Sequence, residues 1–202
     1  MRIRWRDFEL PSGVVMDQES ATATYGRFGV EPFERGFGHT IGNGLRRVLL
    51  SSIEGTAVTA VEIDGVEHEF KSIKGVVEDV TDVVLAIKRL LVQVEGEAPV
   101  TLTLSKGGPC TVTGADVECP SGVTVVNQDL EICTVTDADY TLDVKITVRR
   151  GRGCVAADET GEQMDEIGMI PVDAGFSPVK RVRYAIEATR VGKFTNYDRL
   201  VV

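Results

Sequence analysis

Residue types that carry out catalysis or bind metals are present in this sequence, but they form no recognisable site. Neither histidine, His39 or His68, lies near a Cys or Ser in the frame of an activated nucleophile. The spacing of a zinc ribbon is absent, because none of the four cysteines forms a CxxC pair: Cys110, Cys119, Cys133 and Cys154. The many acidic residues include no cluster like the carboxylate set that holds Mg²⁺ for nucleotidyl transfer. The sequence therefore predicts no catalytic site, no metal and no cofactor.

One arginine-glycine segment is a candidate for binding an anion. Residues 149–153 read RRGRG, but they lack the GxxxxGKS/T frame of a phosphate loop. We prefer to interpret them as a glycine turn that closes a strand. The alternative is a stand-alone enzyme or binding protein that holds a small phosphate ligand through Arg152.

The composition is typical of a globular chain. The 202 residues are 43% hydrophobic, which is enough for one or two domains. No apolar run approaches the roughly 18 residues of a membrane span, and the first residues lack the apolar stretch of a secretory signal. We therefore expect a cytoplasmic protein with reduced thiols and no membrane contact.

Charge is distributed unevenly along the chain. The net charge of −9 argues against general nucleic-acid binding, which needs clustered Lys and Arg. Residues 178–202 nevertheless contain six basic and two acidic residues, whereas residues 107–144 contain seven acidic and no basic residues. This asymmetry suits a protein that presents different faces to different partners. Two ordinary solvated surfaces are the alternative.

The first clear helical pattern follows Thr40, a good N-cap residue. Its apolar positions occupy an arc of about 140° at 100° per residue, and this predicted stripe faces the core or a partner. Gly42 and Gly44 flank the arc, either to admit another backbone closely or because glycine is merely tolerated there. The predicted stripe consists of Ile41, Leu45, Val48, Leu49 and Ile53.

The opposite side of the same helix has the composition of an interface centre. Viewed along the helix axis, Leu50 lies at an angle between those of Arg46 and Arg47. Arginine is enriched at interface centres. A single exposed leucine that needs no explanation is the alternative.

The remaining chain is mostly β-patterned. A second amphipathic helix is predicted over residues 76–92, and alternating strands over 100–105, 140–150 and 179–191. The acidic residues 157–168 are predicted to form an exposed loop. The predicted strand at 179–191 turns basic side chains to solvent.

Two long segments resemble bacterial RNA polymerase alpha subunits. Residues 31–55, EPFERGFGHTIGNGLRRVLLSSIEG, are similar to the first long helix of that family and its lead-in. Residues 172–202 contain DAGFSPVKRV and TNYDRL and are similar to a later pair of strands. AVTAVEIDGVEHEF and RRGRGCV also match, so the resemblance extends from about residue 10 to the end.

The resemblance implies an α+β fold in two domains. A discontinuous dimerisation domain, with a long helix on an antiparallel sheet, is expected at residues 1–54 and 177–202. A β-rich inserted domain is expected at residues 55–176. The implied function is that of a non-catalytic assembly subunit, which dimerises and docks the beta and beta-prime subunits of DNA-directed RNA polymerase for transcription.

Site residues follow from the same resemblance. The resemblance implies that the predicted stripe forms the dimer contact. It also implies that the opposite side of the helix docks the beta subunit through Arg46, Arg47 and Leu50. Arg47 matches the position implicated in docking beta. The beta-prime contact maps to Lys88, Val172, Ser177 and Arg190. Candidate contacts for transcription activators are Glu162, Asp165 and Glu166.

Members of this family normally continue beyond residue 202. The continuation holds a second helix of the dimerisation domain, a linker and a small domain that binds promoter DNA. We therefore expect no direct DNA binding by this chain and an incomplete dimer contact. An assembly subunit of a non-bacterial polymerase is disfavoured by the unbroken ERGFGHT and SPV frames and by the lack of a cysteine cluster.

Overall fold

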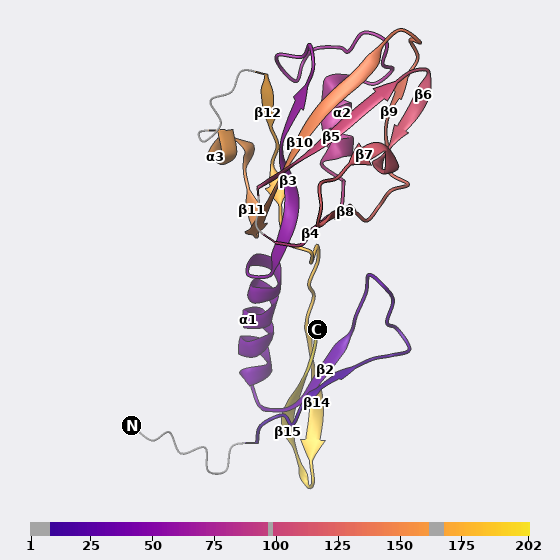
Figure 1. Ribbon diagram of the computed structural model, residues 1–202. Coiled ribbons are helices and arrows are strands. Elements are labelled where there is room, and N and C mark those ends of the chain that lie inside the picture. Colours follow the sequence, from indigo (N-terminus) through magenta and orange to yellow (C-terminus); the bar gives the residue numbers. More distant parts are fainter. Residues whose placement is uncertain (1–8, 97–98, 162–167) are drawn as a thin grey trace. The chain divides into compact units, whose positions relative to one another are not determined.

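The computed structural model describes residues 9–96, 99–161 and 168–202, and the chain divides into two compact units (Figure 1). Unit 1 is Met1–Ser52 with Val179–Val202, and unit 2 is Ile53–Pro178. Unit 2 begins at Ile53, two residues before the predicted boundary at residue 55, and ends at Pro178, two residues after the predicted boundary at residue 176. Every strand pair within the described ranges is antiparallel, and the predicted α+β class is confirmed.

Unit 1 is a four-stranded sheet with one long helix packed on it. The strands lie in the order β1 (Val14–Met16), β2 (Phe28–Glu34), β15 (Phe194–Val201) and β14 (Ala185–Val191). Helix α1 (Phe37–Ser51) contacts β2, β15 and β14. The core under the helix is small and is formed by Val30, Phe33 and Leu200, with Tyr184, Ile186 and Val202 packed against them.

Helix α1 begins and ends earlier than the sequence pattern indicated. Its N-cap is Gly36, whose φ of 90° lies in the left-handed region that favours glycine. The Gly36 N–H donates to Asp198 Oδ2 at 2.8 Å, so an acceptor on β15 caps the helix. Thr40, the predicted N-cap, therefore lies inside the first turn. Because α1 ends at Ser51, Ile53 of the predicted stripe lies outside the helix.

Glycine allows α1 to approach the sheet closely. Gly38 and Gly42 are the buried residues of this helix. A Cβ added at Gly42 would lie 2.6 Å from the Tyr184 ring and 2.9 Å from a Leu200 methyl. A Cβ at Gly44 would meet nothing within 4 Å. Close approach is therefore the role of Gly42, and tolerance explains Gly44.

Unit 2 is built on a five-stranded sheet in the order β12 (Met169–Pro171), β3 (Glu54–Ile63), β10 (Thr141–Arg152), β5 (Val100–Gly107) and β7 (Val117–Glu118). The described residues of this unit also form three two-stranded sheets: β4 (Val92–Val94) with β8 (Val123–Val125), β6 (Cys110–Thr113) with β9 (Glu131–Val135), and β11 (Cys154–Val155) with β13 (Ala174–Gly175). The alternation predicted for β10 is confirmed, since its inward positions are all buried: Leu142, Val144, Ile146 and Val148.

Helix α2 (Val80–Ile87) is much shorter than the predicted residues 76–92. At its start, the Val77 N–H donates to Thr134 O on β9, and Glu78 Oε2 accepts the Thr134 N–H. At its end, the Asn127 side chain accepts the Leu91 N–H at 2.7 Å, which turns the chain into β4. At both ends of the predicted range, contacts with residues distant in sequence therefore take the place of helical hydrogen bonds.

Two further expectations differ from the structure. Residues 157–161, predicted as loop, form α3 (Ala157–Gly161). The strand predicted at 179–191 begins only at Ala185.

Within the described ranges, no helix is long and apolar enough to cross a membrane.

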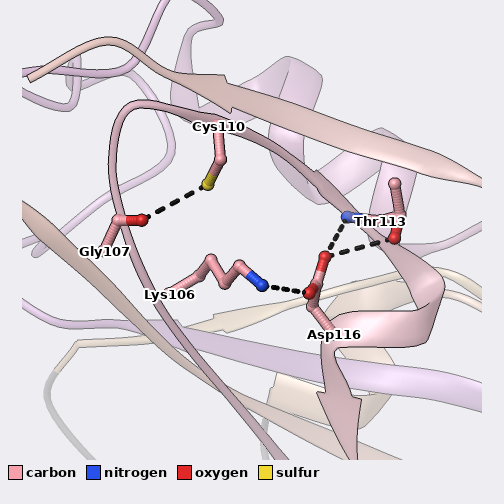
Figure 2. A network of polar contacts seen from close by, with 5 residues as sticks. All are labelled: Lys106, Gly107, Cys110, Thr113 and Asp116. Atoms are coloured by element: carbon pink, nitrogen blue, oxygen red, sulfur yellow. Dashed lines mark hydrogen bonds and ion pairs between the residues drawn. The ribbon is translucent and has the colours of Figure 1, made fainter.

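A polar network holds the turn between β6 and β7 (Figure 2). Lys106 Nζ lies 2.6 Å from Asp116 Oδ1, and Asp116 Oδ2 accepts the Thr113 N–H at 2.8 Å at the start of the 3₁₀ turn η1 (Gly114–Asp116). The Lys106 ammonium, followed by the Thr113 N–H, lowers the pKa of Asp116 below its ordinary value. The folded state therefore favours the ionised carboxylate.

We expect Asp116→Asn to destabilise the chain at neutral pH and much less in acid. A lowered folded pKa stabilises the native state above the unfolded pKa of 3.8, and this contribution is lost as pH falls through the folded pKa. The loss at pH 7 should be about 1 kcal/mol in the free energy of unfolding. Urea unfolding at pH 7 and near pH 3 measures it, with the exposed Asp129→Asn as control. An equal loss at both pH values would contradict this role.

Candidate docking surfaces

Helix α1 has three distinct sides. At about 100° per residue, Gly38 and Gly42 share the side that faces the sheet. A second side carries an apolar row that we call the exposed stripe. Its members retain 45%, 38%, 39% and 53% of their surface: Phe37, Ile41, Leu45 and Val48.

The exposed stripe contains three of the five residues predicted for the dimer contact. Leu49 is half-buried, and Ile53 lies beyond the helix. Phe37 was missed, because placing the N-cap at Thr40 put it outside the helix. The spacing from Phe37 to Ile41, Leu45 and Val48 continues the stripe by one turn, and an earlier helix start would have included it.

The sheet extends the apolar surface of unit 1. Val14 and Met16 on β1 and Phe28 on β2 share the face of Val30 and Leu200, on which α1 packs. Helix α1 does not cover them, and they are 65%, 44% and 38% exposed. No sequence pattern indicated these residues. Apolar surface of this extent is typical of a binding face.

The third side of α1 carries the three residues predicted to dock the beta subunit. Arg46 and Arg47 are exposed and Leu50 is half-buried. No ion pair joins either arginine to another residue in the described part of the chain. We call Arg46, Arg47 and Leu50 the arginine face. Its guanidinium groups are available to a partner.

The structure brings together two of the residues predicted to contact beta-prime. Lys88, the C-cap of α2, lies 3.5 Å from Asp173 Oδ2, and Asp173 adjoins Val172. The Ala157 N–H and then Lys88 lower the pKa of Asp173. The Val172 side chain is 4% exposed and belongs to the core, so in this chain its surface is not available for direct contact. The adjacent Asp173 side chain is exposed.

The arginine-glycine segment, residues 149–153, contacts the backbone of the predicted residue Ser177. Gly151 on β10 pairs with Gly55 on the adjacent strand β3. A Cβ at Gly151 would lie 2.9 Å from the Phe176 ring. The Gly153 carbonyl accepts the backbone N–H groups of Phe176, at 2.9 Å, and of Ser177, at 3.3 Å. These contacts favour a strand-closing turn over a phosphate cradle.

The remaining predicted residues belong to unit 1 or lie outside the described residues. Arg190 is exposed on β14 of unit 1, whereas Lys88, Val172 and Ser177 belong to unit 2. Glu162, Asp165 and Glu166, the candidate activator contacts, lie outside the described residues.

Over residues 9–96, 99–161 and 168–202, no three His, Cys, Asp or Glu side chains are placed to hold a metal. Burial, followed by nearby Glu78, raises the pKa of the Cys133 thiol to about 12, so it is not ionised at neutral pH.

Comparison with known proteins gives one consistent result. The family described as the RNA polymerase Rpb3/RpoA insert domain matches residues 61–177. The chain is 52% identical over 200 residues to the DNA-directed RNA polymerase subunit alpha of Rhodopirellula baltica, covering 99% of this chain and 60% of that protein. It is 46% identical to the Desulfovibrio desulfuricans subunit over 98% of this chain and 57% of that protein. For Kineococcus radiotolerans, identity is 56% over 87% of this chain and 52% of that protein.

This chain belongs to the bacterial RNA polymerase alpha-subunit family. The family match covers most of unit 2, and the alignments with alpha subunits extend through unit 1 as well. The chain spans between about half and three fifths of the length of these relatives.

Proposed function

We propose that this chain is a non-catalytic assembly subunit of a bacterial DNA-directed RNA polymerase. It forms a homodimer through unit 1 and docks the beta and beta-prime subunits, which carry out transcription. It acts in the cytoplasm. The acidic segment with Glu162, Asp165 and Glu166 is a candidate contact for activators.

The observation that carries this proposal is the arrangement of α1. One side packs on the sheet through Gly38 and Gly42, the exposed stripe lies on the second, and the arginine face lies on the third. An apolar row that the described part of the chain leaves exposed suits a permanent contact with a second copy. Two arginines around a half-buried leucine suit a contact with a different protein.

The same arrangement explains how identical chains build an asymmetric enzyme. A two-fold dimer through the exposed stripe duplicates the arginine face and the Lys88–Asp173 pair. In this proposal, one copy docks beta through Arg46, Arg47 and Leu50. The other copy docks beta-prime through Lys88, Ser177 and Arg190, where exposed charges steer the encounter and set the register.

Light scattering coupled to size-exclusion chromatography tests the proposal. The chain is measured alone and then mixed with the matching beta subunit. We expect twice the 21.9 kDa mass of one chain, and a complex that contains beta. A folded monomer that captures no beta would contradict the proposal.

Arg47→Ala should leave the dimer intact and weaken capture of beta by about tenfold or more, because interface arginines are frequent hot spots. Arg47 is exposed, so the fold should not change. Immobilised beta subunit titrated with each variant measures the affinity. Arg152→Ala in unit 2 is the matched control. The alternative phosphate site predicts instead a saturable binding of a phosphate ligand that Arg152→Ala abolishes. Unchanged capture by Arg47→Ala would remove the arginine face from the proposal.

A further inference from the structure

Helix α1 does not cap its own N-terminus. The first N–H groups of a helix have no acceptor within the helix, and this end carries partial positive charge. A side chain at the N-cap normally supplies an acceptor there. In α1 the N-cap is Gly36, which has no side chain, and the first turn contains no acidic residue. The start of α1 therefore depends on another part of the chain.

Asp198 on the inner strand β15 supplies the acceptor. Its Oδ2 atom accepts the Gly36 N–H at 2.8 Å. A Cβ added at Gly38 would lie 3.1 Å from Asp198 Cβ and 3.2 Å from Asp198 Oδ2, so the first turn of α1 lies directly on this side chain. No ion pair joins Asp198 to a basic residue within the described ranges. Its negative charge therefore acts on the positive end of α1.

A change of register between β2 and β15 occurs beside Asp198. Asp198 pairs with Phe33 and Leu200 pairs with Val30, so β2 has one residue more than β15 in this interval. Such a bulge bends the strand and redirects its side chains. Phe33 and Val30 consequently both enter the small core with Leu200. Asp198, two residues from Leu200, shares the face on which α1 packs.

The middle of α1 is held by packing and not by a hydrogen bond from its side chains. A Cβ at Gly42 would lie 2.6 Å from the Tyr184 ring and 2.9 Å from a Leu200 methyl. The Tyr184 ring also lies edge-on to His39, with ring centroids 6.2 Å apart. Apolar packing has no preferred direction, whereas a hydrogen bond fixes the position of its donor. Gly42 is therefore a pivot, and the contact with Asp198 sets the tilt of the helix.

The arginine face lies on the far side of this pivot. At 1.5 Å per residue, Gly36 is about 9 Å before Gly42 along the helix, and Arg47 is about 7.5 Å after it. A tilt that moved the start of α1 by about 1 Å would move Arg47 by roughly 0.8 Å in the opposite direction. A displacement of about 1 Å is enough to weaken a site that depends on directed contacts.

We propose that Asp198 is a positioning residue for docking of the beta subunit. By fixing the start of α1, it sets the tilt at which Arg46, Arg47 and Leu50 meet their partner. Without this contact, docking itself must supply the free energy that holds the helix in place, so the affinity falls. The inference rests on the proposed function and adds to it a residue that lies outside the arginine face.

Substitutions at Asp198 test the inference. Asp198→Ala removes the acceptor and the charge, whereas Asp198→Asn keeps an oxygen acceptor. Asn196→Ala, at an exposed residue of the same strand, is the matched control. Immobilised beta subunit is titrated with each chain at concentrations at which light scattering shows the dimer.

We expect Asp198→Ala to bind beta at least about tenfold more weakly than the unaltered chain, because a hydrogen bond to a charged group is lost. Asp198→Asn and Asn196→Ala should bind within about threefold of the unaltered chain. Equal binding by Asp198→Ala and the unaltered chain would overturn the inference.

A double variant distinguishes positioning from a general loss of stability. Asp198→Ala is combined with Arg47→Ala and titrated in the same way. If Asp198 acts by placing Arg47, its substitution should matter at least about threefold less once the Arg47 side chain is absent. Residues that do not touch otherwise have additive effects. Additive losses would assign Asp198 to the stability of unit 1 alone and overturn the positioning role.

Hydrogen exchange follows the helix in the absence of beta. Asp198→Ala should speed amide exchange of residues 37–42 and leave unit 2 unchanged; unaltered exchange of residues 37–42 would contradict the proposal. If Asp198→Ala loses its circular dichroism, Gly38→Ala takes its place, because the new methyl displaces the first turn and keeps the carboxylate. The same tenfold loss is expected. Capture of beta by the unaltered chain tests the proposed function, so normal binding by the Asp198 variants would remove this inference only.

Discussion

Leu45→Asp should convert the dimer to a monomer at micromolar concentration without unfolding the chain. Leu45 lies in the middle of the exposed stripe and is 39% exposed, so aspartate remains hydrated in the monomer. In a two-fold interface the substitution occurs twice, and each carboxylate would lose water against an apolar surface. We expect the dimer dissociation constant to rise by at least about 100-fold, roughly 2.7 kcal/mol. Sedimentation equilibrium measures this constant.

The matched control is Leu85→Asp, which introduces the same change at a 52% exposed leucine of helix α2. It should leave dimerisation unchanged. A Leu45→Asp chain that still dimerises normally would remove the exposed stripe from the dimer contact. Loss of circular dichroism in that variant would instead mean that Leu45 supports the fold of unit 1.

Gly42→Ala should destabilise unit 1, whereas Gly44→Ala two residues later should stabilise it. The new methyl at position 42 would meet the Tyr184 ring at 2.6 Å and Leu200 at 2.9 Å, so the helix must move away from the sheet. Such overpacking costs about 1–3 kcal/mol. The methyl at position 44 meets nothing within 4 Å and recovers up to about 1 kcal/mol of helix propensity.

Both glycine variants are best made in the Leu45→Asp background, where dimerisation does not contribute to stability. Hydrogen exchange of α1 and β15 reports on unit 1 separately from unit 2. Faster exchange for Gly42→Ala and slower exchange for Gly44→Ala are the expected results. Equal effects of the two substitutions would show that helix propensity, and not contact with Tyr184 and Leu200, decides the stability of this helix.

Much of this protein could be predicted from its sequence. The period of Ile41, Leu45 and Val48 placed three apolar residues on one side of a helix and Arg46 and Arg47 on the other, because 3.6 residues complete a turn whatever lies nearby. Strict alternation located β10 and its buried side chains. The ERGFGHT and SPV segments identified the family, which the comparisons confirm.

Features that depend on distant parts of the chain could not be predicted in this way. Helix α1 begins at Phe37 because Asp198, 162 residues after the N-cap Gly36, accepts the Gly36 N–H. Helix α2 is short because Thr134 and Asn127 take over the backbone groups at its ends. A prediction from local propensity takes no account of these distant partners. It therefore placed the start of α1 four residues too late and extended α2 at both ends.

Tertiary structure also decided which apolar residues are available to partners. Periodicity groups residues on a face but does not tell whether the same chain covers that face. Packing of Gly42 against Tyr184 turned one side of α1 to the sheet and left Leu45 outside, while Val172, predicted at a surface, entered the core beside exposed Asp173. Sequence by itself determined the family and the residues that share each face; three-dimensional packing selected which faces remain exposed, because burial is set by contacts between segments far apart in the chain.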